Sequence, residues 1–155
     1  MIRLDLSTLK DRIGEEVAVS RWFEIGQERI DRFAEATEDR QWIHVDAPRA
    51  AAQSPYGSTI AHGFLTLSMI SPMLMDTIVV PARMAINCGL DRVRFVAPVP
   101  AGSRVRGRFL LASVAPVQGG VQVVWAVAIE RDGDEKPCAV AEWIVRYHDE
   151  VPRTT

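Results

Sequence analysis

One short stretch of this chain combines residue types that can move protons. The run Asp39-Arg40-Gln41-Trp42-Ile43-His44 places a carboxylate and an imidazole five positions apart. Less than twenty residues later, a turn that contains glycine leads into an apolar run that begins at Gly63. A carboxylate beside an imidazole can act in general acid–base catalysis, and the free backbone N–H groups at a helix start can stabilise a developing oxyanion. Together these features predict proton transfer around a carbonyl compound.

The overall composition is that of a soluble globular domain. Of the 155 residues, 48% are hydrophobic and 25% are charged, which is enough apolar material for one domain with its own core. The formal net charge is −2, so bulk electrostatics argue against a nucleic-acid partner. Arg104, Arg106 and Arg108 occupy alternate positions. This spacing predicts the solvated face of a strand and leaves contact with an anionic ligand as the alternative.

The cysteines and the most apolar run bear on compartment and metal content. Cys88 and Cys138 form no C-x-x-C or zinc spacing, so no metal site is expected. Two thiols in a chain without a secretory signal predict a reducing cytoplasm. The most apolar stretch, 59–80, contains His62, Pro72 and Asp76. A lipid-facing span does not readily accept these residues, so we expect no contact with a membrane.

The first half of the chain predicts short elements that position the acid–base pair. A strand is expected over 16–22, followed by an amphipathic helix that ends near Thr37, just before Asp39. Asp46 is a suitable N-cap for the next short helix, and the sequence at 54–57 is typical of a turn. The catalytic motif is therefore expected in the connection between two helices.

The stretch 63–76 predicts one long helix. Nearly all of its residues are apolar, and a helix that is apolar on all sides is expected to be buried on all sides. Pro72 cannot donate a hydrogen bond to the carbonyl of Ser68, so we expect a kink or an early end there.

The second half predicts antiparallel strands. Strands are expected over 84–96, 102–115, 121–129 and 141–147. Gly119-Gly120 and Asp132-Gly133 are typical of hairpin turns. The simplest way to bury one apolar helix is an α+β domain in which the antiparallel sheet wraps around it. We predict a single domain over 1–155 with a polar tail after Asp149.

Three motifs resemble those of a known family. These are Asp39-x-x-x-x-His44, the helix start Ala61-His62-Gly63-Phe64-Leu65-Thr66-Leu67-Ser68, and Gly89-Leu90-Asp91-Arg92-Val93-Arg94-Phe95-Val96-Ala97-Pro98-Val99-Pro100. They look like the motifs of MaoC-like (R)-specific enoyl-CoA hydratases, within a single-domain subgroup that includes nodulation-protein-like members. The resemblance covers roughly residues 10–148. It implies the hot-dog fold, in which an antiparallel sheet wraps a long central helix.

The resemblance also implies roles for individual residues. The implied set is Asp39 and His44 as the catalytic pair, Gly63 as the oxyanion-hole residue, and Gln41, His62 and Ser71 as supporting residues. Two positions depart from the family pattern. Gln41 stands where many members have Asn, which keeps the amide but adds a methylene. Cys88 stands where the subgroup often has Tyr.

The reaction that the resemblance implies is the reversible addition of water to trans-2-enoyl-CoA, which gives (R)-3-hydroxyacyl-CoA. No metal or redox cofactor is expected, because coenzyme A is part of the substrate. The expected partners are the acyl-CoA thioester and a second copy of the chain. A homodimer is expected because an open sheet edge is left to pair.

Each candidate residue also has a structural interpretation. Asp39 is able to end a helix, and His44 to be a hydrogen-bonded core or surface histidine. His62 is interpreted mainly as an anchor for its turn. Ser71, on a helix, is able to bond back to the carbonyl four residues earlier.

Two other functions remain open for the whole protein. One is an acyl-CoA thioesterase, although the central helix offers only Asp76 as a carboxylate. The other is a non-catalytic acyl-thioester-binding protein, which Gln41 and Cys88 favour. The presence of Asp39 and His44 argues against this second alternative.

Overall fold

The computed structural model describes residues 1–149. Residues 150–155, which make up the predicted polar tail, lie outside the described residues. The strands are β1 (Ile2–Arg3), β2 (Glu16–Val19), β3 (Phe23–Ile25), β4 (Ile78–Val79), β5 (Met84–Phe95), β6 (Ser103–Val117), β7 (Gly120–Arg131) and β8 (Ala139–His148). The helices are the 3-10 turn η1 (Leu9–Arg12), α1 (Gln27–Thr37), α2 (Trp42–Val45), α3 (Ala47–Gln53), α4 (Gly63–Ser68) and α5 (Ile70–Thr77).

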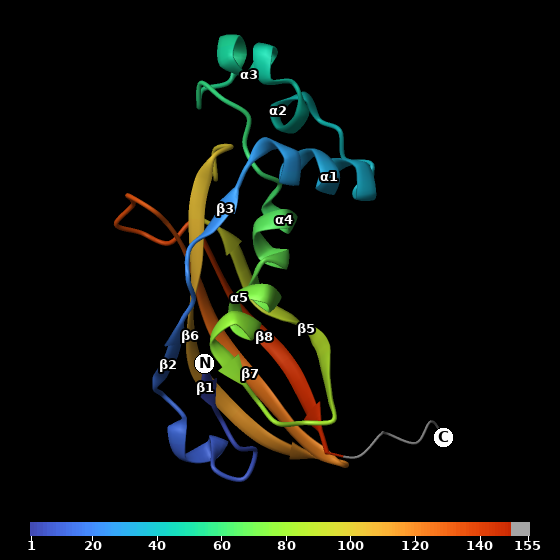
Figure 1. Ribbon diagram of the computed structural model, residues 1–155, viewed down its shortest axis with the longest axis vertical. Coiled ribbons are helices and arrows are strands. Elements are labelled where there is room, and N and C mark those ends of the chain that lie inside the picture. The colour runs from blue at the N-terminus through green and yellow to red at the C-terminus, as the bar shows by residue number, and fades with distance from the viewer. Residues whose placement is uncertain (150–155) are drawn as a thin grey trace.

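One antiparallel sheet forms the body of the molecule (Figure 1). Its strand order is β2-β6-β7-β8-β5, and β3 also pairs with β6. The hairpins turn at Gly119 and Gly133, whose positive φ angles of 72° and 88° suit glycine. Within residues 1–149, no strand pairs with the outer edge of β5. The predicted α+β class and the antiparallel sheet are confirmed.

Alternating side chains make one face of the sheet apolar. The inward-facing residues of β7 are Val123, Trp125, Val127 and Ile129, all of which are buried. Phe109 and Leu111 of β6 and Trp143 of β8 join the same core. Period-two alternation places every second residue on one face, so the predicted strands bury their apolar residues against the helix that they surround.

The central helix is split into α4 and α5 at Met69. Pro72 lies one turn later and has no N–H to donate to the carbonyl of Ser68, so the helical ladder is interrupted there. The predicted break therefore occurs, but at Met69, three residues before Pro72. No helix within residues 1–149 combines the length and the apolar character needed to cross a membrane.

The prediction that this helix is buried on all sides is wrong. Phe64 and Met75 are each 69% exposed, and Ser68 and Ser71 between them are also exposed. These residues recur every three or four positions and so form one face. The opposite face packs against β2 and β6. The curved sheet therefore covers one side of the helix, and residues 1–149 leave Phe64, Ser68, Ser71 and Met75 on the other side exposed.

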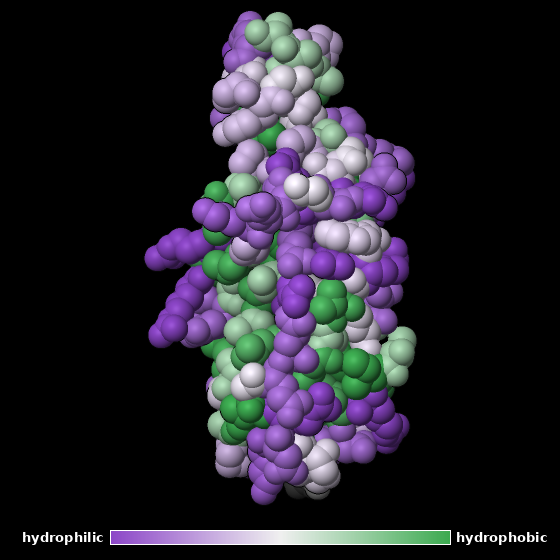
Figure 2. Space-filling model, turned by 90° about the vertical axis from the view of Figure 1, so that its left-hand side faces the viewer, coloured by the Kyte–Doolittle hydropathy of each residue, from purple (hydrophilic) through white to green (hydrophobic). Residues whose placement is uncertain are grey.

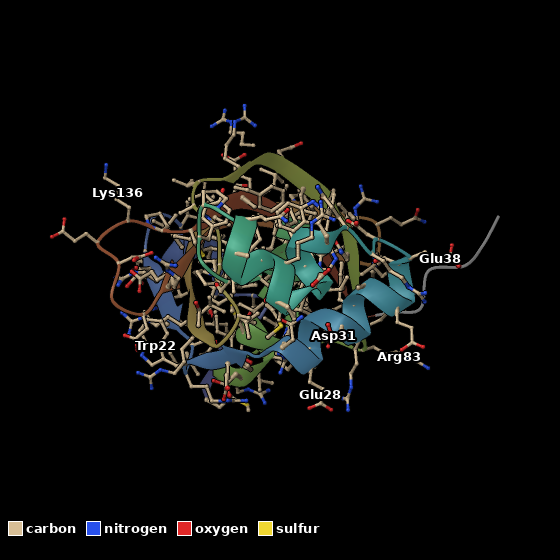
Figure 3. The ribbon with its side chains drawn as sticks, turned by 90° about the horizontal axis from the view of Figure 1, so that it is seen from above. Trp22, Glu28, Asp31, Glu38, Arg83 and Lys136 are labelled. Carbon is tan, nitrogen blue, oxygen red and sulfur yellow. The ribbon has the colours of Figure 1, made fainter. Side chains whose placement is uncertain are left out.

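The segment from α1 to α3, residues 27–62, forms a polar cap over one end of the sheet (Figure 1). Ile30 and Ala34 of α1 face the core, whereas Glu28 and Glu38 point outward in the view from above (Figure 3). The predicted cap of α3 is confirmed, because the side chain of Asp46 accepts a hydrogen bond from the N–H of Arg49 at 3.0 Å.

Arginines of β6 form ion pairs with acidic residues on the neighbouring strands β2 and β7 and on the turn after β7. Arg106 Nε lies 2.7 Å from Glu130 Oε2, and Arg108 Nη2 lies 2.7 Å from Glu16 Oε1. Arg104 pairs with Asp132. The side of the molecule formed by β2 and β6 shows hydrophilic residues beside apolar patches (Figure 2). The arginines thus belong to a solvated, ion-paired face, as predicted.

Candidate active site

The end of α1 places Asp39 in the turn that leads to α2. Glu38 adopts a left-handed conformation with φ 62° and ends the helix. Asp39 follows it and is exposed. One of its carboxylate oxygens, Oδ1, accepts a weak hydrogen bond from the N–H of Gln41 at 3.4 Å. The rest of the carboxylate remains free to meet a ligand or a water molecule.

His44 is buried on α2 and held from two sides. Its side chain is positioned by the carbonyl of Ile60, 2.7 Å from Nδ1. Since a carbonyl only accepts, Nδ1 carries the proton and Nε2 keeps a lone pair. Gln27 Nε2 donates to the backbone carbonyl of His44 at 2.7 Å, and Thr59 donates to Gln27 Oε1. These contacts fix both the main chain and the ring of His44.

His62 links the turn of Asp39 to the start of α4. Its Nε2 lies 2.9 Å from the backbone carbonyl of Asp39, so Nε2 is the protonated nitrogen. Its ring stacks on that of His44, with the centroids 3.8 Å apart and the planes 24° apart. Its Nδ1 is buried and finds no partner among the described residues. The two imidazoles and the carboxylate of Asp39 form one cluster.

The surroundings of His44 favour its neutral form. Burial lowers its pKa below the ordinary value of 6.5, the carbonyl of Ile60 raises it, His62 lowers it and Asp39 raises it, with the lowering effects larger in sum. A neutral imidazole near pH 7 has a lone pair on Nε2 and is able to accept a proton. The electrostatics of the site therefore suit a general base.

A cavity of about 390 Å³ opens beside this cluster. Its walls include His44, Tyr56, Gly63, Thr66, Phe95 and Cys138. A larger cavity of about 540 Å³ runs along α5 and another of about 440 Å³ lies on the outer face of the sheet, but their walls contain no histidine. Chemistry rather than size therefore identifies the first cavity, called the His44 cavity below, as the candidate site.

Gly63 is the first residue of α4 and lines the His44 cavity. Its N–H has no acceptor within the helix, because the carbonyl four residues earlier precedes the helix. A Cβ at this position would lie 3.0 Å from ring carbons of Phe95. Glycine therefore allows Phe95 to pack closely and keeps the backbone accessible from the cavity.

The structure brings together some of the predicted residues and separates others. Asp39, His44 and His62 offer ligand atoms that all lie within 4.8 Å of one another. Gln41 is exposed at the N-cap of α2 and makes no side-chain capping bond. Ser71 lies on the exposed face of α5 and lines other cavities, not the His44 cavity. It contacts the sulfur of Met75 at 3.9 Å instead.

Sequence reasoning missed several residues around the site. Gln27 and Thr59 hold His44, but a polar residue at the start of a helix carries no signal for that role. Cys138 lies just before β8 and lines the His44 cavity. Burial raises the pKa of its thiol to about 11, so it stays protonated. No sequence pattern predicts that Tyr56 and Phe95 line the His44 cavity.

The cluster of Asp39, His44 and His62 brings three possible metal ligands within 4.8 Å of one another. A tetrahedral ion needs ligand lone pairs that converge on one point. The lone pairs of imidazoles lie in the ring planes, and these two rings are stacked 24° apart. The lone pairs of the two imidazoles therefore lie in nearly parallel planes.

Comparisons with known proteins agree with this architecture. Residues 8–132 match the family described as "MaoC like domain". The chain is 46% identical over 148 residues to nodulation protein N of Rhizobium leguminosarum bv. viciae, a match that covers 93% of this chain and 91% of that protein. It is 49% identical over 136 residues to 3-hydroxyacyl-thioester dehydratase Z of Mycobacterium tuberculosis, covering 86% and 89%.

Solved structures share the fold. An R-hydratase from Pseudomonas aeruginosa aligns with a TM-score of 0.70 and 23% identity over 92% of this chain and 91% of that chain. An (R)-hydratase from A. caviae aligns with a TM-score of 0.71 and 22% identity over 87% and 96%. These likenesses establish the architecture, and the predicted hot-dog fold is confirmed.

Proposed function

This chain belongs to the family of MaoC-like domains, and we propose that it catalyses the reversible hydration of trans-2-enoyl-CoA to (R)-3-hydroxyacyl-CoA. The proposal is supported by its similarity to 3-hydroxyacyl-thioester dehydratase Z and by a fold that it shares with two R-hydratases. The observation that carries the proposal is the position of His44 in the wall of a cavity, with Asp39 beside it and the start of α4 in the same wall.

The catalytic step proposed for the pair begins with one water molecule between Asp39 and His44. Neutral Nε2 of His44 takes a proton from the water as its oxygen attacks the β-carbon of the enoyl thioester. The resulting imidazolium delivers that proton to the α-carbon on the same face. Asp39 orients the water and stabilises the positive charge of the imidazolium. Each such proton transfer contributes about 10² to 10⁴ in rate.

Gly63 is the proposed donor to the thioester oxygen. Negative charge develops on that oxygen as water adds, and the first N–H of a helix is a suitable hydrogen-bond donor for it. Removing a donor of this kind costs about 10² to 10³ in kcat. The proposed reaction needs no metal or redox cofactor, because water and the protein's own groups supply every proton and coenzyme A is part of the substrate.

We propose that the protein acts as a homodimer. The outer edge of β5 is unpaired within residues 1–149, and Ile86 and Phe95 on this strand are 38% and 48% exposed. Phe64 and Met75 of the central helix are exposed near it. Open edges and exposed apolar faces are covered in native assemblies, and a second copy of the chain covers both at once.

A cytoplasmic location is part of the proposal. Cys88 and Cys138 are both free thiols, the first exposed and the second buried. Unpaired cysteines are usual in a reducing compartment.

A thioesterase would need a carboxylate on the central helix. Asp76, the only carboxylate of α4 and α5, lies near the far end of α5. It pairs with Arg21 at 3.0 Å and does not line the His44 cavity. This contact supports hydration over thioester hydrolysis.

The experiment that tests the proposed reaction is incubation of the protein with crotonyl-CoA. We expect loss of the enoyl absorbance without release of free coenzyme A thiol, and a product of the (R) configuration by chiral analysis. Release of free thiol would instead identify a thioesterase. Binding without either change, by protein of native circular dichroism, would leave the acyl-thioester-binding alternative.

A further inference from the structure

The His44 cavity has a neighbour along the central helix. A second cavity of about 270 Å³ lies between the helix and strands β5 and β8, with walls that include Phe64, Leu67, Ser71, Leu90 and Trp143. The cavity of about 540 Å³ along α5 shares Ser71, Asn87 and Trp143 with it. Together these two cavities form a groove that continues from the second cavity toward the far end of the helix, called the helix groove below.

The helix groove is suited to an apolar chain. Its main polar atoms bond to each other, because Trp143 Nε1 donates to Asn87 Oδ1 at 3.0 Å and the same oxygen accepts from the N–H of Gly89 at 3.2 Å. The remaining walls are largely leucine, methionine, valine and aromatic side chains. Satisfied polar groups leave apolar surface for a ligand.

Two phenylalanines separate the His44 cavity from the helix groove. Phe95 lines the first, and Phe64 lines the second. Their ring centroids are 6.0 Å apart, and their planes make an angle of 72° in an edge-to-face contact. Phe95 also lies directly against Gly63. The pair therefore forms a partition beside the proposed oxyanion donor.

The side chains of this partition lie outside the buried core of the chain. Phe95 is 48% exposed and Phe64 is 69% exposed. Removing either ring would join the two cavities without removing a core residue.

We propose that Phe64 and Phe95 form a gate that sets the acyl-chain length of the substrate. The inference rests on the proposed function and goes beyond it by naming the specificity determinant. With the rings in contact, the His44 cavity holds the thioester and a short acyl chain. With a ring removed, additional methylenes extend into the helix groove.

The size of the expected change in chain-length preference follows from the number of methylenes that become buried. Octenoyl-CoA has four more carbons than crotonyl-CoA. Each buried methylene contributes roughly fourfold in binding, so four of them contribute up to roughly 200-fold. Imperfect packing of the new channel reduces this gain. We expect an increase of at least about tenfold in the preference for octenoyl-CoA.

The test compares kcat/KM for crotonyl-CoA and trans-2-octenoyl-CoA. The wild type is expected to prefer crotonyl-CoA, and Phe95→Ala and Phe64→Ala to raise the octenoyl-to-crotonyl ratio at least about tenfold. Tyr56→Ala is the matched control, because Tyr56 also lines the His44 cavity and is 48% exposed but does not line the helix groove. Its ratio is expected to stay within about twofold of the wild type.

An unchanged ratio in both phenylalanine variants, or an equal rise in Tyr56→Ala, would overturn the gate. Phe95→Leu, which retains apolar packing against Gly63, covers the case in which Phe95→Ala fails to fold, and a smaller rise is expected from it. Sedimentation shows which of the Phe64 and Phe95 variants keep the oligomeric state of the wild type, and those variants decide.

A binding measurement distinguishes failure of the gate from failure of the proposed reaction. Titration calorimetry with butyryl-CoA and octanoyl-CoA, which cannot be hydrated, reports chain-length preference without turnover. A wild type that hydrates nothing while the variants shift the ratio of Kd values toward octanoyl-CoA would reject the hydratase proposal and keep the gate. Hydration with no shift in either ratio would reject the gate and keep the hydratase.

Discussion

The polar cap and the sheet body hold themselves together in different ways. In the cap, α2 and α3 are short, and polar groups such as half-buried Gln27 and buried Thr59 and His44 bond to one another or to backbone carbonyls. In the body, long strands bury apolar side chains at every second position. The cap is therefore fixed by a few specific contacts and the body by many interchangeable ones. The cap therefore supplies the geometry for catalysis, and the sheet body supplies most of the stability of the fold.

The largest expected effect is a loss of stability in the sheet body, with every catalytic group unchanged. Trp125 is fully buried in the centre of β7, and truncation of a buried tryptophan costs about 3–5 kcal/mol. Trp125→Ala should lower the free energy of unfolding by that amount, measured by urea denaturation, while the activity per folded molecule remains near that of the wild type. Trp22→Ala is the control, because Trp22 is only half-buried beneath Arg106, and it should cost clearly less.

The next largest effect is expected when a contact that positions His44 in the cap is removed and the catalytic groups are kept. Gln27→Ala removes the donor to the carbonyl of His44 and the acceptor of Thr59. We expect kcat/KM for crotonyl-CoA to fall about 10- to 100-fold, because small displacements of a catalytic side chain cost rates of this order. The free energy of unfolding should fall by about 1–3 kcal/mol.

A matched glutamine in the same cap supplies the control. Gln53 ends α3 and is exposed, and it accepts a hydrogen bond from Arg49 Nε at 3.1 Å. Gln53→Ala should leave both kcat/KM and stability nearly unchanged. Equal losses in the two variants would mean that the cap is merely fragile and that Gln27 has no special part in positioning His44.

A smaller effect is expected from pH. Burial lowers the pKa of His44 in the folded protein below 6.5, so the folded state binds fewer protons than the unfolded state as pH falls through this range. The free energy of unfolding should therefore decrease as pH falls from above 6.5 through the folded pKa. The acidic limb of kcat/KM should lie below pH 6.5, since the base is lost only when Nε2 is protonated. A limb at or above 6.5 would contradict the neutral-base assignment.

The smallest expected effect on activity comes from a residue of the sheet body that lies outside the polar cap and its cavity. Ser71 lies on the exposed face of α5 and outside the His44 cavity. Ser71→Ala should change kcat/KM for crotonyl-CoA by less than about twofold. A loss of tenfold or more would give Ser71 a part in the chemistry that its position in this structure does not explain.

The same contrast decides what the sequence was able to predict. The strands, their hairpins and the interruption before Pro72 follow from alternation, glycine and proline, which act over a few residues. Asp39 and His44 are close in the chain, so their proximity was also predictable. These features are local, and a single sequence records them directly.

Other features depend on contacts between distant segments. Gln27 meets the carbonyl of His44 across 17 positions, and nothing in its neighbours marks it. The exposed face of Phe64 and Met75 was missed, because apolar residues that await a partner have the same pattern as apolar residues in a core. Phe95 and Cys138 reach the His44 cavity only after the sheet has folded around it.

The most direct test of the account is a double-mutant cycle on the catalytic pair. Crotonyl-CoA hydration is measured with the wild type, Asp39→Asn, His44→Ala and the double variant, all checked for native thermal unfolding. We expect each single variant to lose about 10³-fold or more in kcat/KM, and the double variant to lose little beyond the worse single one, because residues that act as a unit are not additive. Near-wild-type activity in either single variant, or losses that simply multiply in the double variant, would contradict the proposed pair.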